Sequence, residues 1–186
     1  KKAIVCLFPY FSGNRSGNLS LYAHSEDYHK IVTEKLTEIS DYIKSISGCE
    51  TECFCDIGPS VDRLLAFNAG LGFYGKNQML INDEYGSYFF IGYVLCKLDL
   101  EPDSPINKQC ISCGKCIEAC PGGALFENGF DINKCASHIS QKKGELTDEE
   151  VNILKKSALV LVAIYAREFV RITKTLAVQW KSLLKT

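Results

Sequence analysis

The sequence lacks an excess of charge of either sign and lacks a long apolar run. Its 21 Lys and Arg residues nearly balance 22 Asp and Glu residues, which leaves a formal net charge of −1 over 186 residues. A generally basic surface is therefore excluded, and any contact with nucleic acid needs a local patch. The longest apolar stretch, Ala158 to Ala166, is too short to cross a bilayer. We therefore expect a soluble protein with no membrane partner.

The start of the chain has neither an initiator methionine nor a charged and then apolar leader. Lys1 and Lys2 run directly into Ala3 to Tyr10, a β-branched and aromatic stretch that predicts a buried strand. Because a domain rarely begins inside its own core, we expect that sequence preceding Lys1 is missing. The lack of a leader also favours a reducing cytoplasm as the compartment.

Cysteine, in contrast, is abundant, and four of the ten cysteines form one motif. The sequence C-x2-C-x2-C-x3-C-P, in which Pro121 follows the last cysteine, is typical of a loop that binds a [4Fe–4S] cluster. The short spacings let one loop present three sulfurs to one cluster, while the proline breaks any helix and turns the fourth cysteine toward a second cluster. Structural zinc usually has paired C-x2-C knuckles, which fit this pattern poorly. The pattern predicts electron transfer through the thiolates of Cys110, Cys113, Cys116 and Cys120.

A second cluster requires further ligands, and the later sequence supplies few. Cys135 is the only cysteine after the motif, so five ligands are present where two clusters need eight. Cys6, Cys49 and Cys96 lie in apolar or turn contexts and are expected to be core thiols. Cys53 and Cys55 can be read as a redox pair or as ordinary buried thiols, and the second reading is favoured.

The spacing of apolar residues predicts both helices and strands within residues 1–100. Apolar residues from Ile31 to Ile46, with Leu36, Ile39 and Ile43 between them, predict one helical face, with Ser25 as N-cap and Gly48 as stop. A second short helix is expected over 61–69, and a strand over 87–97. These elements indicate an α+β or α/β fold.

The remaining sequence divides the chain into three predicted regions. We expect a first, partial domain over residues 1–103, and a proline-containing linker at 101–105 leads into a cysteine module over 104–160. In that module Thr147 and Glu150 form a capping box that opens a helix through about Leu159. Residues 161–186 are an atypical C-terminal segment.

Four segments in order, followed by the cysteine motif, resemble the epoxyqueuosine reductase family. The match runs from about Leu7 to Leu159 and is more specific than the cysteine motif alone. The segments are Asp27-Tyr-His29, Asp56-Ile-Gly-Pro-Ser-Val-Asp-Arg63, Ala69-Gly-Leu-Gly-Phe-Tyr-Gly-Lys-Asn77 and Gly86-Ser-Tyr-Phe-Phe-Ile-Gly92.

The resemblance implies a fold, an activity and a set of cofactors. Members reduce the epoxide of epoxyqueuosine in tRNA to the alkene of queuosine, with a cobalamin and two [4Fe–4S] clusters. The expected fold is thus α+β, with an α/β-like cobalamin domain similar to that of reductive dehalogenases and a small ferredoxin-like iron–sulfur module. An electron donor such as ferredoxin or flavodoxin is the implied protein partner. Two alternatives remain: a non-catalytic ferredoxin-type electron carrier, and a corrinoid-dependent reductase of another small molecule.

Asp56 matches the proton donor proposed for the family. A carboxyl group can donate a proton near neutral pH only where burial keeps it protonated, and the apolar neighbours Phe54 and Ile57 are compatible with such burial. The alternative is a turn or cap residue before Gly58 and Pro59.

The resemblance also implies contacts to the corrin. Glycines allow a backbone to approach a flat macrocycle closely, although they can equally cap a helix or form a turn. His29 is a further candidate, near either the corrin or the substrate, or else a packing residue. The implied cofactor-binding residues are His29, Gly72, Lys76, Asn77, Ser87 and Phe89.

The shortage of cysteines also suggests a reading-frame error after about Val160. The family pattern has Phe-Gly-Cys-Asp-x-Cys-Gln-x-x-Cys-Pro about where this chain has Leu161 to Thr175. One permitted set of codons for 160–175, with a single T restored, encodes Phe-Gly-Cys-Asp-Ile-Cys-Gln-Arg-Ile-Cys-Pro. The three recovered cysteines bring the total to eight; by the family pattern Cys120 and Cys135 then share one cluster, and the first three motif cysteines share the other. The alternative is an amphipathic C-terminal helix.

Overall fold

The computed structural model describes residues 1–11, 13, 19–24 and 26–157, and its centre is a three-stranded antiparallel sheet. The sheet has the order β1-β5-β2, so that β5 lies between the other two strands and runs antiparallel to both. β1 and β2 are therefore parallel to each other, and α1 connects them in a split β-α-β arrangement. The bounds are β1 Lys2–Pro9, α1 Tyr28–Ser47, β2 Thr51–Cys55 and β5 Phe89–Cys96.

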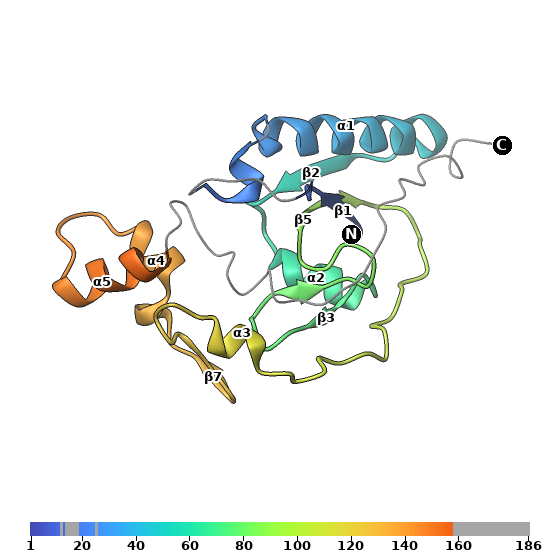
Figure 1. Ribbon diagram of the computed structural model, residues 1–186. Helices are drawn as coiled ribbons and strands as arrows, with labels where there is room; N and C mark the ends of the chain where they lie inside the picture. The colour runs from blue at the N-terminus through green and yellow to red at the C-terminus, as the bar shows by residue number, and fades with distance from the viewer. Residues whose placement is uncertain (12, 14–18, 25, 158–186) are drawn as a thin grey trace.

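One helix covers each face of the sheet (Figure 1). Successive side chains of a strand point to opposite faces, so alternate residues of β5 enter different cores. On the α1 side, Val94 and Cys96 pack with Val32, Leu36 and Ile43. On the other side Phe89 packs with Ala66 of α2 (Asp62–Asn68) and with Leu80. The expected strand at the start of the chain and the expected α+β class are confirmed.

Two details of the predicted first helix are wrong. Its N-cap is Asp27 rather than Ser25, and the Asp27 carboxylate accepts a hydrogen bond from the backbone N–H of His29 at 3.0 Å. Ile31 and Ile46 are 38% and 62% exposed, whereas Val32 is buried. The sheet covers only a narrow stripe of α1, and a stripe centred on Val32, Leu36 and Ile43 leaves the flanking isoleucines in solvent. Gly48, in the left-handed conformation, ends the helix as predicted.

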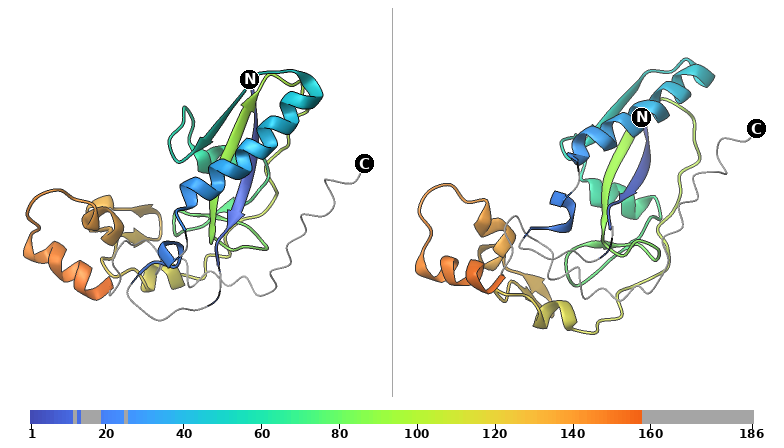
Figure 2. Two further views of the ribbon diagram at one scale, coloured as in Figure 1. Left: turned by 90° about the horizontal axis from the view of Figure 1, so that it is seen from above. Right: turned by 45° about the horizontal axis from the view of Figure 1, so that its top comes forward.

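A smaller module follows the sheet domain in sequence and lies to one side of it (Figure 2). The expected capping box is confirmed, because the backbone N–H of Thr147 donates to Glu150 at 2.9 Å and the N–H of Glu150 donates to Thr147 at 3.3 Å. A core of Ala136, Ile139 and Ile153 joins α4 to α5. The bounds in this module are α3 Lys115–Glu118, β6 Leu125–Phe126, β7 Gly129–Phe130, the 3-10 helix η2 Ile132–Lys134, α4 Ala136–Ser140 and α5 Asp148–Ser157. A second 3-10 helix, η1 Leu21–His24, lies between β1 and α1 in the chain.

Two predictions about the end of the chain lie outside the described residues. These are the atypical segment over 161–186, with its reading-frame hypothesis, and the last residues of the helix predicted through Leu159. Among the residues that are described, no helix combines the length and apolar character of a membrane span.

Candidate functional site

Asp56 occupies the position directly after β2, where the chain leaves the sheet. Its backbone has φ +61°, a left-handed conformation that aspartate tolerates better than most residues because its short side chain bonds locally. Phe54 and Ile57 do not bury the carboxyl group: the Asp56 side chain is 43% exposed, and Ile57 is 89% exposed. The sharp turn after β2 directs Ile57 into solvent, while Phe54 stacks on Tyr93. Asp56 is therefore an accessible carboxyl group beside the sheet.

His29 lies between Asp56 and Asp27. Its Nε2 is 3.1 Å from Oδ2 of Asp56, and its Nδ1 is 2.7 Å from Oδ1 of Asp27. The hydrogen bond to Asp27 is the main cause of a raised pKa for His29, and the charge of Asp56 adds to it. The same bond lowers the pKa of Asp27. The structure thus brings together two residues that the sequence analysis had singled out separately.

Tyr28 also contacts the carboxyl group of Asp56. Its hydroxyl donates a hydrogen bond to Oδ2 of Asp56. The Tyr28 ring stacks on Phe90 of β5, with centroids 3.9 Å apart and planes inclined by 6°, and on the ring of His29 at 4.1 Å. Burial, followed by the bond to Asp56, raises the pKa of the Tyr28 phenol, so that the phenol remains a donor near neutral pH.

A pocket of about 380 Å³ opens beside Asp56 and contains two of the predicted cofactor contacts, Ser87 and Phe89. Ser87 is only 2% exposed, and its hydroxyl has no hydrogen-bond partner among the described residues. An unpaired buried hydroxyl costs about 1–3 kcal/mol, so such a group in a pocket wall is suited to pair with a ligand. The other lining residues are Ser60, Val61, Asp62, Arg63, Met79, Leu80, Phe90 and Ile91.

Two further charged residues, Asp62 and Arg63, line this pocket. Burial, and then the nearby Asp56 carboxylate, raises the pKa of Asp62. Arg63 extends from α2 and donates a hydrogen bond to the backbone carbonyl of Gln78. This contact ties the Asp56 side of the domain to the glycine-rich segment, whose strands β3 (Phe73–Tyr74) and β4 (Leu80–Ile81) form a short hairpin.

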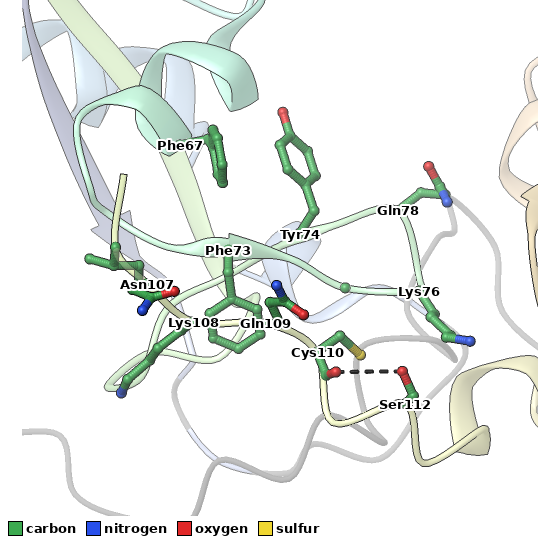
Figure 3. A pocket seen from close by; sticks show the side chains of 12 residues that line it. Phe67, Phe73, Tyr74, Lys76, Gln78, Asn107, Lys108, Gln109, Cys110 and Ser112 are labelled. Carbon is green, nitrogen blue, oxygen red and sulfur yellow. Dashed lines mark hydrogen bonds between the residues drawn. The ribbon is translucent and has the colours of Figure 1, made fainter. Parts of the chain in front are cut away.

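A second pocket, of about 600 Å³, lies between that hairpin and the start of the cysteine loop (Figure 3). Aromatic side chains, including Phe67 and Tyr74, line one end, and Cys110 and Ser112 line the other. Lys76, a predicted cofactor contact, borders this pocket and pairs with Glu127 in the β6–β7 hairpin turn. Residues of the cysteine loop and residues of the sheet domain thus line the same pocket.

Gly72 and Asn77 are packed into the protein rather than placed on the walls of either pocket. A Cβ on Gly72 would lie 2.5 Å from the carbonyl oxygen of Ile81, so this position requires glycine for the approach of the two hairpin strands. Asn77 is 6% exposed, and its Oδ1 accepts a hydrogen bond from the N–H of Met79. For these two residues, the geometry favours the structural alternative.

The four motif cysteines lie on a short loop and a single helical turn. Cys110 and Cys113 precede α3, Cys116 lies within it, and α3 ends at Glu118 before Cys120 and Pro121. Ser112 at φ +53° and Gly114 at φ +76° bend the loop tightly. The proline thus follows the end of the helix, as expected.

Cys135 lies beside the part of the loop that follows Cys120. A Cβ on Gly122 would be 2.0 Å from the carbonyl oxygen of Lys134, so the two backbones touch directly before Cys135. The Cys120 sulfur accepts a hydrogen bond from the N–H of Ala124 at 3.2 Å. The backbones that carry Cys120 and Cys135 thus lie close together, although among the described residues no three His, Cys, Asp or Glu side chains converge as a metal site. A shared cluster for Cys120 and Cys135 stays a prediction.

Of the five remaining cysteines, Cys96 is buried, and Cys6, Cys49, Cys53 and Cys55 are partly buried. Cys53 and Cys55 are free thiols in the structure. Cys96 is 1% exposed in the α1 core, and burial raises the pKa of Cys6 to about 11.

We expect Cys113→Ala to lower bound iron and labile sulfide, because it removes a thiolate from the exposed cluster loop. The control is Cys96→Ala, which removes a buried thiol and leaves the loop intact; its iron content should equal that of the parent chain. Chemical iron and sulfide assays on anaerobically reconstituted protein measure both. Equal losses in the two variants would mean that cluster ligands and core thiols had been confused.

Tyr28, Asp27 and Arg63 are site residues to which the sequence analysis gave no role. The first two belong to the Asp27-Tyr-His29 segment, whose significance was visible only for the histidine. Assigning the helix N-cap to Asp27 instead of Ser25 would have pointed to Asp27, since a capping aspartate lies beside the residue two positions later.

Two family models match the chain. The first, described as "Epoxyqueuosine reductase QueG, DUF1730", matches residues 1–57, and the second, a "4Fe-4S double cluster binding domain", matches residues 109–164. The second match covers all five predicted ligands and supports iron–sulfur clusters over structural zinc.

Curated relatives and solved structures agree with these models. An epoxyqueuosine reductase from Lactococcus garvieae is 38% identical over 137 residues, which are 73% of this chain and 39% of that protein. The structure of epoxyqueuosine reductase from Streptococcus thermophilus matches with a TM-score of 0.77 at 27% identity, over 89% of this chain and 47% of that one. An epoxyqueuosine reductase bound to a tRNA-Tyr epoxyqueuosine-modified stem loop matches with a TM-score of 0.68 at 36% identity, over 79% and 42%. The chain thus spans less than half the length of these relatives.

Proposed function

The chain belongs to the epoxyqueuosine reductase family, and from this premise we propose that it reduces the epoxide of epoxyqueuosine in tRNA to the alkene of queuosine. The observation that carries the proposal is the pocket beside Asp56. It combines an accessible carboxyl group with a buried unpaired hydroxyl, that of Ser87, and an aromatic wall that includes Phe89. Such a combination of apolar walls with a few polar groups is typical of a small-molecule or cofactor site.

Two kinds of cofactor are proposed to serve the reaction. The iron–sulfur domain supplies [4Fe–4S] clusters on Cys110, Cys113, Cys116, Cys120 and Cys135. Cobalamin, when bound, supplies a strongly reducing cobalt centre. Ser87 fits a cobalamin site because its buried hydroxyl is free to pair with the amide groups at the edge of the macrocycle, and Lys76 borders the adjoining pocket that Cys110 also lines.

The reaction has a defined balance of atoms and electrons. Conversion of an epoxide to an alkene breaks two C–O bonds, forms a C=C bond and releases the oxygen as water, which consumes two electrons and two protons. A one-electron donor would supply the electrons, and clusters held by the motif cysteines would provide the electron-transfer chemistry. Asp56 is the proposed group that passes protons to the departing oxygen, and Tyr28 orients its carboxyl group through the hydrogen bond to Oδ2. Because Asp56 is exposed and not kept protonated by burial, a neighbouring acid has to supply its proton, and Nε2 of His29 lies 3.1 Å from Oδ2.

The proposed partners follow from the family. A relative has been solved with an epoxyqueuosine-modified tRNA stem loop, which supports tRNA as the substrate of this chain. A small electron carrier such as ferredoxin or flavodoxin is the proposed reductant, and the cytoplasm is the proposed compartment.

Two experiments test the function and separate it from a non-catalytic electron carrier. Cells that lack the gene should accumulate epoxyqueuosine in their tRNA; unchanged queuosine levels would contradict the substrate. Anaerobic protein mixed with cobalamin should perturb the cobalt absorption spectrum, whereas an electron carrier would leave the spectrum unchanged.

We expect Ser87→Ala to weaken cobalamin binding by roughly tenfold, because the variant loses a hydrogen bond of about 1–1.5 kcal/mol to the ligand. Ser45→Ala, on the exposed side of α1 and remote in sequence from the pocket, is the control. Titration of the cobalt spectrum measures both affinities. Equal affinity in Ser87→Ala and the parent chain would remove Ser87 from the site.

A further inference from the structure

The proposed reaction consumes two protons, and Asp56 can hold only one at a time. We propose that Asp27, His29 and Asp56 form a proton relay, in which His29 returns a proton to Asp56 and Asp27 is the positioning residue that sets the orientation of His29. This inference rests on the proposed function, since it supplies the second proton of that reaction.

The geometry of the imidazole defines which nitrogen exchanges the proton. An ionised carboxylate only accepts hydrogen bonds, so the contact of 2.7 Å from Nδ1 to Asp27 requires the hydrogen to be on Nδ1. The other nitrogen, Nε2, then faces Oδ2 of Asp56 at 3.1 Å. Asp27 therefore holds His29 with Nε2 as the only ring nitrogen free to pass a proton to Asp56.

Asp27 is fixed by the backbone. As the N-cap of α1, its Oδ1 accepts the His29 backbone N–H at 3.0 Å and also the His29 ring nitrogen. The stack of Tyr28 on Phe90 anchors the same turn of the helix to the sheet. A carboxylate held by two contacts to one residue leaves the imidazole little freedom to rotate.

The proton steps balance without another acid. Asp56 starts as a carboxylate paired with the imidazolium of His29. Nε2–H protonates Asp56, which passes the proton to the departing epoxide oxygen, and His29 becomes neutral with its remaining hydrogen on Nδ1. His29, with a side chain that is 54% exposed, then takes a proton from solvent at Nε2. A second transfer by the same route completes water, and a second uptake from solvent restores the starting state.

The charges around His29 favour the imidazolium. Asp27 and Asp56 contact it directly, and the Tyr28 phenol, whose pKa is raised, contributes no charge near neutral pH. Beyond Asp56 lie Asp62 and the Cys55 thiol, whose pKa is raised to about 11, chiefly by burial. The hydrogen bond to Asp27 is the largest cause of the raised pKa of His29, so removing this carboxylate should lower that pKa.

The test compares Asp27→Asn with Asp41→Asn. Asparagine caps a helix about as well as aspartate, so the first variant keeps α1 and loses only the negative acceptor beside His29. Asp41→Asn makes the same change on the same helix at a carboxylate that contacts Lys44 and not His29. Nitrogen-15 NMR of the His29 side chain in the full chain should show a lower pKa in Asp27→Asn only.

The pH dependence of turnover provides a second test of the relay. Activity needs the imidazolium, so it falls as pH rises through the His29 pKa; in Asp27→Asn this fall should occur at lower pH, with KM unchanged. An unmoved pH profile together with an unmoved NMR titration would overturn the relay. If the parent chain shows the His29 titration but no reduction of epoxyqueuosine, the proposed function fails while the placement of His29 stands.

Discussion

Asp56→Asn should reduce epoxyqueuosine reduction by at least about 100-fold, because it removes the proton donor of the proposed reaction. The change is nearly isosteric, and asparagine tolerates the left-handed backbone at φ +61° as aspartate does. Its side-chain oxygen can still accept the Tyr28 hydroxyl. We therefore expect cluster content, cobalamin binding and thermal unfolding close to those of the parent chain.

Asp62→Asn is the matched comparison for this prediction. Asp62 lies in the same pocket but forms no hydrogen bond or ion pair with His29 or Tyr28 among the described residues, so its loss should cost less than about tenfold. Single-turnover assays with an epoxyqueuosine-modified stem loop and a chemical reductant measure both variants. Normal turnover in Asp56→Asn would reject Asp56 as the acid.

The 186-residue chain should bind fewer than eight iron atoms. Correction of the reading frame should raise the bound iron to eight atoms, which is the second large effect that we expect. Five predicted thiolate ligands, Cys110, Cys113, Cys116, Cys120 and Cys135, cannot complete two clusters that need eight. A chain in which one nucleotide is restored after Val160 should carry eight ligands and bind two full clusters.

Sequencing the encoding DNA decides this prediction first. Codons for 160–175 that give no Cys-x2-Cys-x3-Cys-Pro in either alternative frame would exclude a frame error. Where such codons are found, iron and sulfide assays on the original and corrected chains provide the second comparison. Equal iron content in the two chains would show that the recovered cysteines are not ligands.

Features that depend on short stretches of sequence were predictable. The cysteine spacing identified the iron–sulfur module, since the ligands of such a loop lie within a few residues of one another. The capping box at Thr147 and Glu150 and the glycine stop at Gly48 depend on neighbours within one turn. The β-branched runs of β1 and β5 likewise indicated strands.

The arrangement of the site depended on the tertiary structure. Tyr28 and Asp56 are 28 positions apart, and they meet because the end of β2 lies beside the start of α1. No local pattern reports that distance, nor that Asp56 is half exposed while Ser87 is buried and unpaired. The sequence by itself determined which residue types could carry electrons and protons, because ligand spacing and caps are short-range. Only the packing of α1 and α2 on the sheet decided which of them touch, because burial and side-chain contact arise from segments distant in the chain.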